Sequence, residues 1–295
     1  MYHQAYGIIE TLAPLHVGAA AGEEVGNINL IFRDQFTRTG IIPGSSIRGR
    51  LRAEMWHNHQ GDEKYVATWY GNDTTYNNDV ADSTSSNRTT ESLVKFEYAS
   101  IVWLPVFCPG QPIVWVSCPH LLKRYIRIAR LNISSPEKYT HSKELKPLPN
   151  GKLFFNFGFL SVSLDDSYNW SSLFPSGKNL PVVIVGDDEI SMIHDMALYR
   201  QSRVALEKDQ KRNLNKAFFE VEALPEGTIL AFPIGLKKHN SGEQWQPFSV
   251  KQTEGDNKIT NETRTNKTTS DIYLGGLESV GFGHCQVNLF NIHVV

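Results

Sequence analysis

The chain has 295 residues, 40% of them hydrophobic and 20% charged, a composition typical of globular proteins with one elaborated domain or two small ones. Its formal net charge of −2 does not indicate a nucleic-acid binder, so such a role must rest on local basic clusters. The three cysteines form no Cys-x-x-Cys pair, which argues against a zinc site and a disulfide framework and favours a reducing compartment.

The N-terminal segment lacks the basic start and apolar run of a signal peptide, and no stretch approaches the roughly 18 apolar residues of a membrane span. We therefore predict a cytoplasmic protein without a membrane partner. Residues 6–10 predict a strand, and the Pro-Gly-Ser-Ser turn at residues 43–46 predicts the start of a helix. Ile47, Leu51 and Met55 give that helix an apolar stripe at i, i+4 and i+8.

Residues 57–92 are polar and predict a surface insertion that forms a solvated loop, and residues 237–270 predict a second long polar loop. A helix is predicted to begin at Pro119, and a short one to span residues 187–196. Further strands are predicted at residues 95–106, 113–117, 153–164, 180–185 and 228–234, and at the end of the chain. Because strands and helices mix without a regular βαβ order, we predict an α+β fold, in a single domain over residues 1–295.

The first candidate binding motif is the segment 42–52, which reads IPGSSIRGRLR. Ser45 or Ser46 is expected to cap the helix, whose free N–H groups and dipole favour an anion at its start. Arg48 and Arg52 lie four residues apart, so both project from one side of the helix. These features predict a phosphate-binding site, although a capped helix with a solvated basic face would have the same pattern.

Two further segments carry candidate binding residues. Residues 274–284 hold four glycines that let the backbone approach a ligand closely, although tight turns between strands need the same residues. Residues 200–216 form a basic hairpin or helix suited to a nucleic-acid backbone, with a solvated charged loop as the alternative. The residues concerned are Gly275, Gly276, Gly281, Gly283, Arg200, Arg203, Lys208, Lys211, Arg212 and Lys216.

Several ordered motifs resemble the backbone subunits of type III CRISPR effector complexes, which belong to the RAMP superfamily. The opening IETLAPLHVGAA, followed by VGNINLIFRDQFTRTGIIPGSSIRGRLR, resembles the start of these subunits. LPVFCPGQPIVWVSCPHLLKRY resembles the Cmr-type branch, and YRQSRVALEKDQKRNLNKAFFEVEALPEGTILAF resembles the thumb hairpin and the strand after it. LGGLESVGFGHCQV resembles the C-terminal glycine-rich motif, so the resemblance runs in order over residues 8–288.

The resemblance implies a ferredoxin-like core, similar to an RNA-recognition motif, with a protruding thumb at about residues 199–222. It implies that copies stack along a guide RNA, and that the thumb inserts between guide and target. The residues implied to hold guide phosphates are Ser45, Ser46, Arg48, Gly49, Arg52, Gly275, Gly276, Gly281 and Gly283. Family members often cut target RNA beside the thumb with a divalent metal and an aspartate of the early loop.

The element that carries this aspartate in the family reads VGNIN here, with Asn29 at its position. An amide cannot become an anion, so Asn29 is a poor proton acceptor and a weak ligand for a hard cation. Asp34 follows five residues later as a possible substitute, or as a structural partner of Arg33 or Arg38. His16 is a second candidate, either as a general base or in a positional role.

The prediction that follows is a guide-RNA-binding subunit that positions target RNA in an antiviral ribonucleoprotein, with a degenerate endoribonuclease site. One alternative is an active metal-dependent endoribonuclease acting through Asp34. Another is a stand-alone guide-processing ribonuclease that uses His16. No stably bound cofactor or metal is expected. Mg²⁺ is expected only if the subunit retains cleavage. The expected partners are guide RNA, target RNA, other effector subunits and stacked copies or paralogues of the chain.

Overall fold

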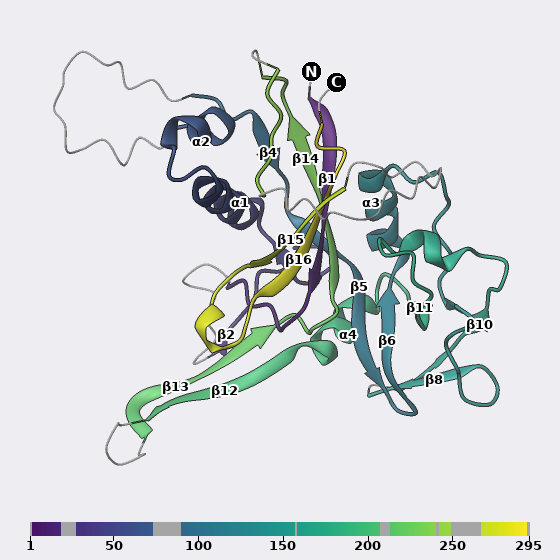
Figure 1. Ribbon diagram of the computed structural model, residues 1–295. Coiled ribbons are helices and arrows are strands. Elements are labelled where there is room, and N and C mark those ends of the chain that lie inside the picture. The colour runs from purple at the N-terminus through teal and green to yellow at the C-terminus, as the bar shows by residue number, and fades with distance from the viewer. Residues whose placement is uncertain are drawn as a thin grey trace, which may run out of the picture.

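The computed structural model describes residues 2–18, 28–72, 90–156, 158–206, 213–239, 242–248 and 267–293. An 11-stranded mixed sheet runs through the molecule (Figure 1). Its main path is β10 (Ser163–Leu164), β7 (Thr140–His141), β11 (Val182–Ile184), β6 (Gln111–Ser117), β5 (Ala99–Cys108), β14 (Ile229–Leu236), β1 (His3–Thr11), β16 (His284–Phe290) and β15 (Lys267–Tyr273). Two short strands complete it: β3 (Ile41–Ile42) pairs with β5, and β4 (Val94–Phe96) pairs with β14.

The strand β1 is buried on both faces, which explains its continuous apolar run. It lies antiparallel between β14 and β16, with Ile8 opposite Ala231 on one side and Asn288 on the other. Ala5 and Ile9 belong to one hydrophobic cluster, whereas Tyr6 and Ile8 belong to another. The sheet therefore separates two cores.

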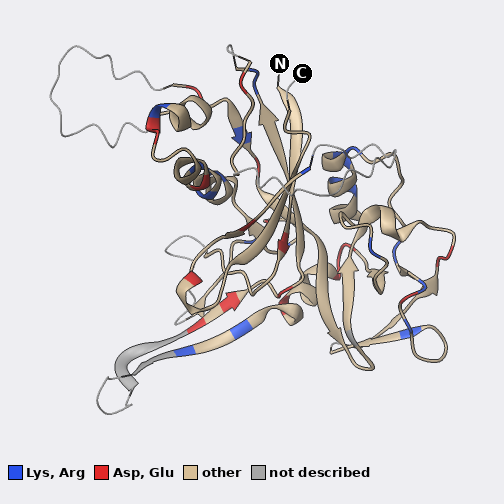
Figure 2. Cartoon of the chain, in the orientation of Figure 1, with Lys and Arg blue, Asp and Glu red and all other residues tan. Residues whose placement is uncertain are grey.

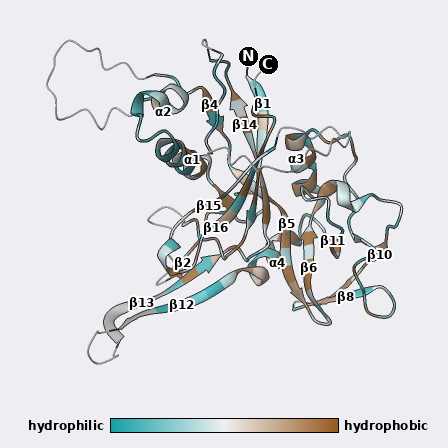
Figure 3. Ribbon diagram, in the orientation of Figure 1, coloured by the Kyte–Doolittle hydropathy of each residue, from teal (hydrophilic) through white to brown (hydrophobic). Residues whose placement is uncertain are grey.

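Helices cover both faces of the sheet. The larger core contains buried residues of α1 (Gly44–Asn58), α2 (Glu63–Tyr70) and α4 (Ile190–Ala197). The smaller core contains residues of α3 (Pro119–Ala129) and of the 3₁₀ helix η2 (Trp170–Leu173). Hydrophobic residues gather along the central strands and the inner sides of the helices (Figure 3). No helix among the described residues is long and apolar enough to cross a membrane.

Most predicted elements are present, including the helix that begins at Pro119 and the buried stripe of Ile47, Leu51 and Met55. Three expectations were wrong in detail. The insertion predicted at residues 57–92 contains the helix α2, and its described part is therefore not only a solvated loop. The single strand predicted at residues 153–164 is divided into β8 (Lys152–Phe155), β9 (Gly158–Ser161) and β10. The start of α1 has Pro43 as its N-cap residue, with no side-chain cap from a serine.

A long hairpin leaves the body of the molecule (Figure 1). Its strands are β12 (Tyr199–Leu206) and β13 (Asn213–Ala223), and the short strand β2 (Ile28–Asn29) pairs in parallel with the base of β13. The expected basic residues Lys208, Lys211 and Arg212 lie outside the described residues, as do residues 73–89 of the insertion and most of the loop 237–270.

Candidate nucleic-acid interface

A surface cavity of about 480 Å³ joins two motifs that lie more than two hundred residues apart in the sequence. One wall is α1, and the other is the glycine-rich segment after β15. The cavity is lined by Val17, Gly18, Ser46, Gly49, Arg50, Ala53, Tyr273, Gly275, Gly276 and Glu278. We call it the cradle. Its single lysine or arginine, Arg50, is matched by one carboxylate, Glu278, so small residues and backbone groups dominate its surface.

The helix α1 presents different residues to three sides. Ile47, Leu51 and Met55 face the core, whereas the small side chains that line the cradle lie on a neighbouring stripe. Arg50 belongs to that stripe, forms an ion pair with Glu54 one turn later, and has a buried Nε without a hydrogen-bond partner among the described residues. Arg50 is therefore the arginine of this helix that an anion in the cradle would meet.

Arg48 and Arg52 do project from one side of α1, as expected, but that side faces α2. Arg48 Nη2 donates to the Tyr70 carbonyl oxygen over 2.6 Å. The guanidinium carbon of Arg48 lies 5.9 Å from the centre of the Tyr70 ring. Arg52 Nη2 lies 2.7 Å from Glu63 Oε1. Both arginines thus hold α2 against α1, and neither lines the cradle. Their expected contact with guide phosphates stays a prediction.

The start of α1 is open to a ligand. Ser46 lines the cradle within the first turn, Ser45 is exposed, and no side chain caps the helix. Such an N-terminus favours an anion through its N–H groups and its dipole. The fold itself requires a glycine at residue 44, because a Cβ on Gly44 would lie 2.6 Å from the Phe96 carbonyl oxygen.

The glycines of the two motifs divide into those that the fold needs and those that it does not. Gly275 and Gly283 have φ values of +80° and +85°, and a Cβ at either would collide with a backbone oxygen at 2.2 or 2.3 Å. Gly281 has a φ of +94°, which a turn requires. Gly49 and Gly276 show neither constraint: nothing lies within 4 Å of a Cβ at Gly49, and the nearest atom at Gly276 is 3.9 Å away. Both line the cradle, where the absence of side chains leaves the backbone accessible.

His16 links the cradle to the hairpin. Its ring is buried, and Nδ1 lies 2.6 Å from the Glu222 carbonyl oxygen of β13. Its own carbonyl oxygen accepts from the N–H of Gly276 over 2.9 Å. These contacts connect the loop of His16 to the hairpin and to the glycine-rich segment, and a catalytic role for His16 stays a prediction.

The base of the hairpin is fixed to the glycine-rich segment. Val221 and Ala223 of β13 form a small hydrophobic cluster with Phe282. Arg203 lies over the Phe282 ring at 4.9 Å and donates through Nη2 to the Val280 carbonyl oxygen over 3.3 Å. Charged residues of both signs follow the described part of this arm (Figure 2). The hairpin therefore begins beside the cradle.

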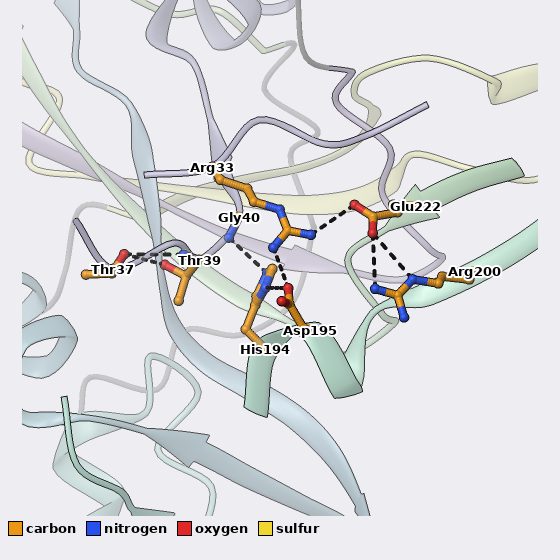
Figure 4. Close-up of polar contacts among 8 residues, drawn as sticks. All are labelled: Arg33, Thr37, Thr39, Gly40, His194, Asp195, Arg200 and Glu222. Atoms are coloured by element: carbon orange, nitrogen blue, oxygen red, sulfur yellow. Dashed lines mark hydrogen bonds and ion pairs between the residues drawn. The ribbon is translucent and has the colours of Figure 1, made fainter. Parts of the chain in front are cut away.

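A buried charge network fixes the other side of the hairpin base (Figure 4). The Glu222 carboxylate, 5% exposed, accepts from Arg33 Nη2 over 3.0 Å and from Arg200 Nη2 over 3.2 Å. Arg33 also pairs with Asp195 of α4. The His194 ring and the Arg33 guanidinium lower the pKa of Asp195 to about 2, against the opposing effect of burial.

The ring of His194 is fully buried at the edge of this network. Its Nε2 accepts from the N–H of Gly40 over 2.9 Å, so the proton of the neutral ring lies on Nδ1. Nδ1 lies 3.6 Å from Asp195 Oδ1. Burial lowers the pKa of His194.

Asn29 and Asp34, two of the three candidate catalytic positions, have different surroundings. Asn29 pairs with Val221 at the hairpin base. Asp34 Oδ1 accepts from the N–H groups of Phe36 and Thr37 and from the Thr37 hydroxyl over 2.8–3.0 Å. Burial alone would raise the pKa of Asp34, but these hydrogen bonds outweigh it and lower the pKa.

Asp34 thus stabilises a local turn, and Arg33 pairs with Asp195 and Glu222. The expected pairing of the Asp34 carboxylate with Arg33 or Arg38 was wrong: among the described residues Arg33 pairs elsewhere, and Arg38 contacts Asp34 only through a backbone hydrogen bond. Among the described residues, no three carboxylate, imidazole or thiol groups converge to hold a metal ion. The neutral amide of Asn29 and the engaged carboxylate of Asp34 do not fit a site for Mg²⁺.

Arg50 and Tyr273 are among the cradle residues that sequence reasoning missed. Arg50 follows from the helical positions of Ser46 and Ala53, which are four and three residues away and share its side. Tyr273 ends β15 with a ring that is 43% exposed, and a base can stack on such a ring. No pattern in the sequence marks Tyr273 as part of the site.

The model of the RAMP superfamily matches residues 8–286. The fold is similar to a chain of the type III-B Cmr-beta complex bound to cognate target RNA, with a TM-score of 0.65 and 18% identity over 97% of both chains. It is also similar to a crystal structure of Cmr4 (TM-score 0.62, 16% identity, 98% of this chain and 100% of that chain).

An oligomeric Cmr4 from Pyrococcus furiosus is similar as well, with a TM-score of 0.64 and 16% identity over 98% of this chain and 99% of that chain. No curated protein matches the chain significantly. The family match covers nearly the whole chain, and the structural likeness extends over the same length. This chain belongs to the RAMP superfamily.

Proposed function

We propose that the chain is a guide-RNA-binding backbone subunit of a type III CRISPR effector complex, and that it positions target RNA without cutting it at its own site. The observation that carries this proposal is the cradle, where one side of α1, from Ser46 to Ala53, faces a glycine-rich segment. Its two glycines without a structural reason, Gly49 and Gly276, leave room for a phosphate backbone.

Several further features support the proposal. The hairpin β12–β13 starts beside the cradle and leaves the body of the molecule, as a thumb between guide and target would. We assign it that role, and we assign the sheet and its helices to a modified ferredoxin-like core. The similar structures are Cmr chains, one in a complex bound to cognate target RNA and one oligomeric, which supports RNA and stacked subunits as partners.

The proposed loss of cleavage rests on Asn29 and Asp34. Metal-assisted cleavage needs an anionic group that holds the cation near the scissile phosphate. Asn29 carries no charge, and Asp34 uses one oxygen to accept three hydrogen bonds within its own turn. We therefore propose that the subunit binds RNA without a stably held metal ion.

A graded series at Gly49 tests the cradle, because the fold tolerates side chains there. Alanine, glutamine and glutamate all favour a helix more than glycine, by up to about 1 kcal/mol, so the variants should be at least as stable as the wild type. Affinity of the full chain for single-stranded guide RNA should fall from Gly49→Ala through Gly49→Gln to Gly49→Glu, as volume and then negative charge are added.

Thermal unfolding of each variant provides the control, and Gly110→Glu serves as a surface comparison at a turn where a Cβ also meets nothing within 4 Å. Its positive φ of 83° makes that variant less stable, yet RNA binding should persist. A folded Gly49→Glu variant with the affinity of the wild type would contradict the proposed binding site.

A further inference from the structure

One side of α3 carries a row of exposed cations on the opposite face of the sheet from the cradle. Lys123 and Arg127 lie at i and i+4, and Arg130 follows at the C-cap. The row spans about 10 Å along the helix axis. No aspartate or glutamate occurs in the sequence between Glu97 and Glu137. The basic residues of α3 stand out in Figure 2.

Within the described part of the chain, no carboxylate pairs with Lys123 or Arg127. Arg130 donates to Gln4, which is a neutral amide. The adjacent Arg124 differs, because it is 13% exposed and donates to the Ser100 hydroxyl over 3.0 Å. Lys123 and Arg127 therefore differ from Arg124, which the fold itself anchors.

Helix stability does not explain the row. Like charges at i and i+4 destabilise a helix by about 0.2–0.5 kcal/mol. The helix dipole favours cations only near the C-terminus, so it accounts for Arg127 and Arg130 but not for Lys123 in the N-terminal half. Lys123 therefore has no stabilising role that the described residues show, and its charge is available to an anionic ligand.

The chemistry of this surface favours a nucleic acid over a protein. The apolar side of α3, including Leu122 and Tyr125, is buried in the smaller core. The outer side has no large exposed hydrophobic residue among the described residues. Protein interfaces are built around an apolar centre, whereas binding to a phosphate backbone needs cations alone.

We propose that Lys123, Arg127 and Arg130 form a second RNA site, which holds the phosphate backbone of single-stranded RNA without regard to sequence. The site is separate from the cradle, because α1 packs with Ala5 and Ile9 of β1 and α3 packs with the other face of that strand. The inference rests on the charges of α3 and does not depend on the proposed function.

The variant Lys123→Glu separates binding from folding. It places a glutamate four residues before Arg127, which is the favourable order for a helical ion pair. The helix should therefore be as stable as in the wild type or more stable. Binding to the row should fall, because one cation is lost and the neighbouring Arg127 is neutralised.

The measurement is fluorescence anisotropy of a short polyuridine RNA with the full chain at several salt concentrations. One lost phosphate contact flattens the salt dependence of single-strand binding by about 0.7 in log–log slope, so Lys123→Glu should flatten it by at least about 0.7. The same loss should appear in a Gly49→Glu background, where the cradle is blocked. Lys123→Arg should retain the slope of the wild type.

Lys152→Glu is the matched control, since it makes the same charge change at an exposed residue of β8, far from α3 (Figure 1). A slope for Lys123→Glu that equals that of Lys152→Glu would overturn the proposal. Polyglutamate serves as the competing ligand. If polyglutamate binds more tightly than RNA in the Gly49→Glu background, and Lys123→Glu abolishes its binding, the occupant is an acidic polypeptide and the RNA assignment is wrong.

Discussion

Replacing Glu222 by glutamine tests whether the charge network holds the base of the hairpin. The substitution keeps the size of the side chain and one acceptor oxygen, but it removes the charge between two guanidinium groups. Arg33 would keep its pairing with Asp195, whereas Arg200, with a side chain 54% exposed, can turn towards water.

The size of the effect follows from these surroundings. Breaking a fully buried ion pair costs about 3–5 kcal/mol, and a hydrogen bond to a charged group contributes about 1.5–3 kcal/mol. Because Arg33 keeps one carboxylate and Arg200 is half exposed, the lower range applies, and we expect Glu222→Gln to cost about 2 kcal/mol. Arg200→Gln should cost less than about 1 kcal/mol, as for an exposed pair.

Urea unfolding, followed by circular dichroism, measures the change in the free energy of unfolding. Glu220→Gln is the matched control, because this residue lies two positions before Glu222 on the same strand and accepts only from the Ser202 hydroxyl, over 3.3 Å, among the described residues. It should cost less than about 0.5 kcal/mol. Equal losses in the two variants would refute the idea that the network stabilises the hairpin base.

Three further predictions follow from the site. In an assembled complex with complementary RNA, Asn29→Asp should create a magnesium-dependent cut beside this subunit's hairpin; a cut by the wild type that Asp34→Ala abolishes would show instead that Asp34 is catalytic. Because burial holds the pKa of His194 below its ordinary value, its contribution to stability is complete above about pH 6.5 and falls at lower pH, by at most about 1.4 kcal/mol per pH unit. When the pH falls from about 7.5 to about 5.5, the free energy of unfolding measured in urea should therefore decrease less in His194→Gln than in the wild type. Equal decreases would show that His194 is not the source of the pH dependence. Limited proteolysis of the free chain should cut within residues 199–222, and RNA or assembly should protect that segment; protection in the RNA-free chain would count against a protruding thumb.

Local patterns in the sequence determined much of the secondary structure. The stripe of Ile47, Leu51 and Met55 and the proline at residue 119 predicted α1 and the start of α3, because helical period and proline geometry act over a few residues. The ordered motifs also predicted the family, which the match over residues 8–286 confirms. The sequence showed the glycine-rich motif. It did not show that Gly275, Gly281 and Gly283 are required by the backbone whereas Gly276 is not.

The tertiary structure decided which side of each element forms the site. Spacing of four residues placed Arg48 and Arg52 on one side of α1, but only the packing of α2 determined that this side turns away from the cradle and that Arg50 faces it. The order of strands in the sheet brings α1 beside the segment after β15. Likewise, Arg33 and Glu222 meet through pairings between distant segments, which no local period encodes. Contacts of this kind depend on the arrangement of the whole sheet, and a pattern read over a few residues carries no information about it.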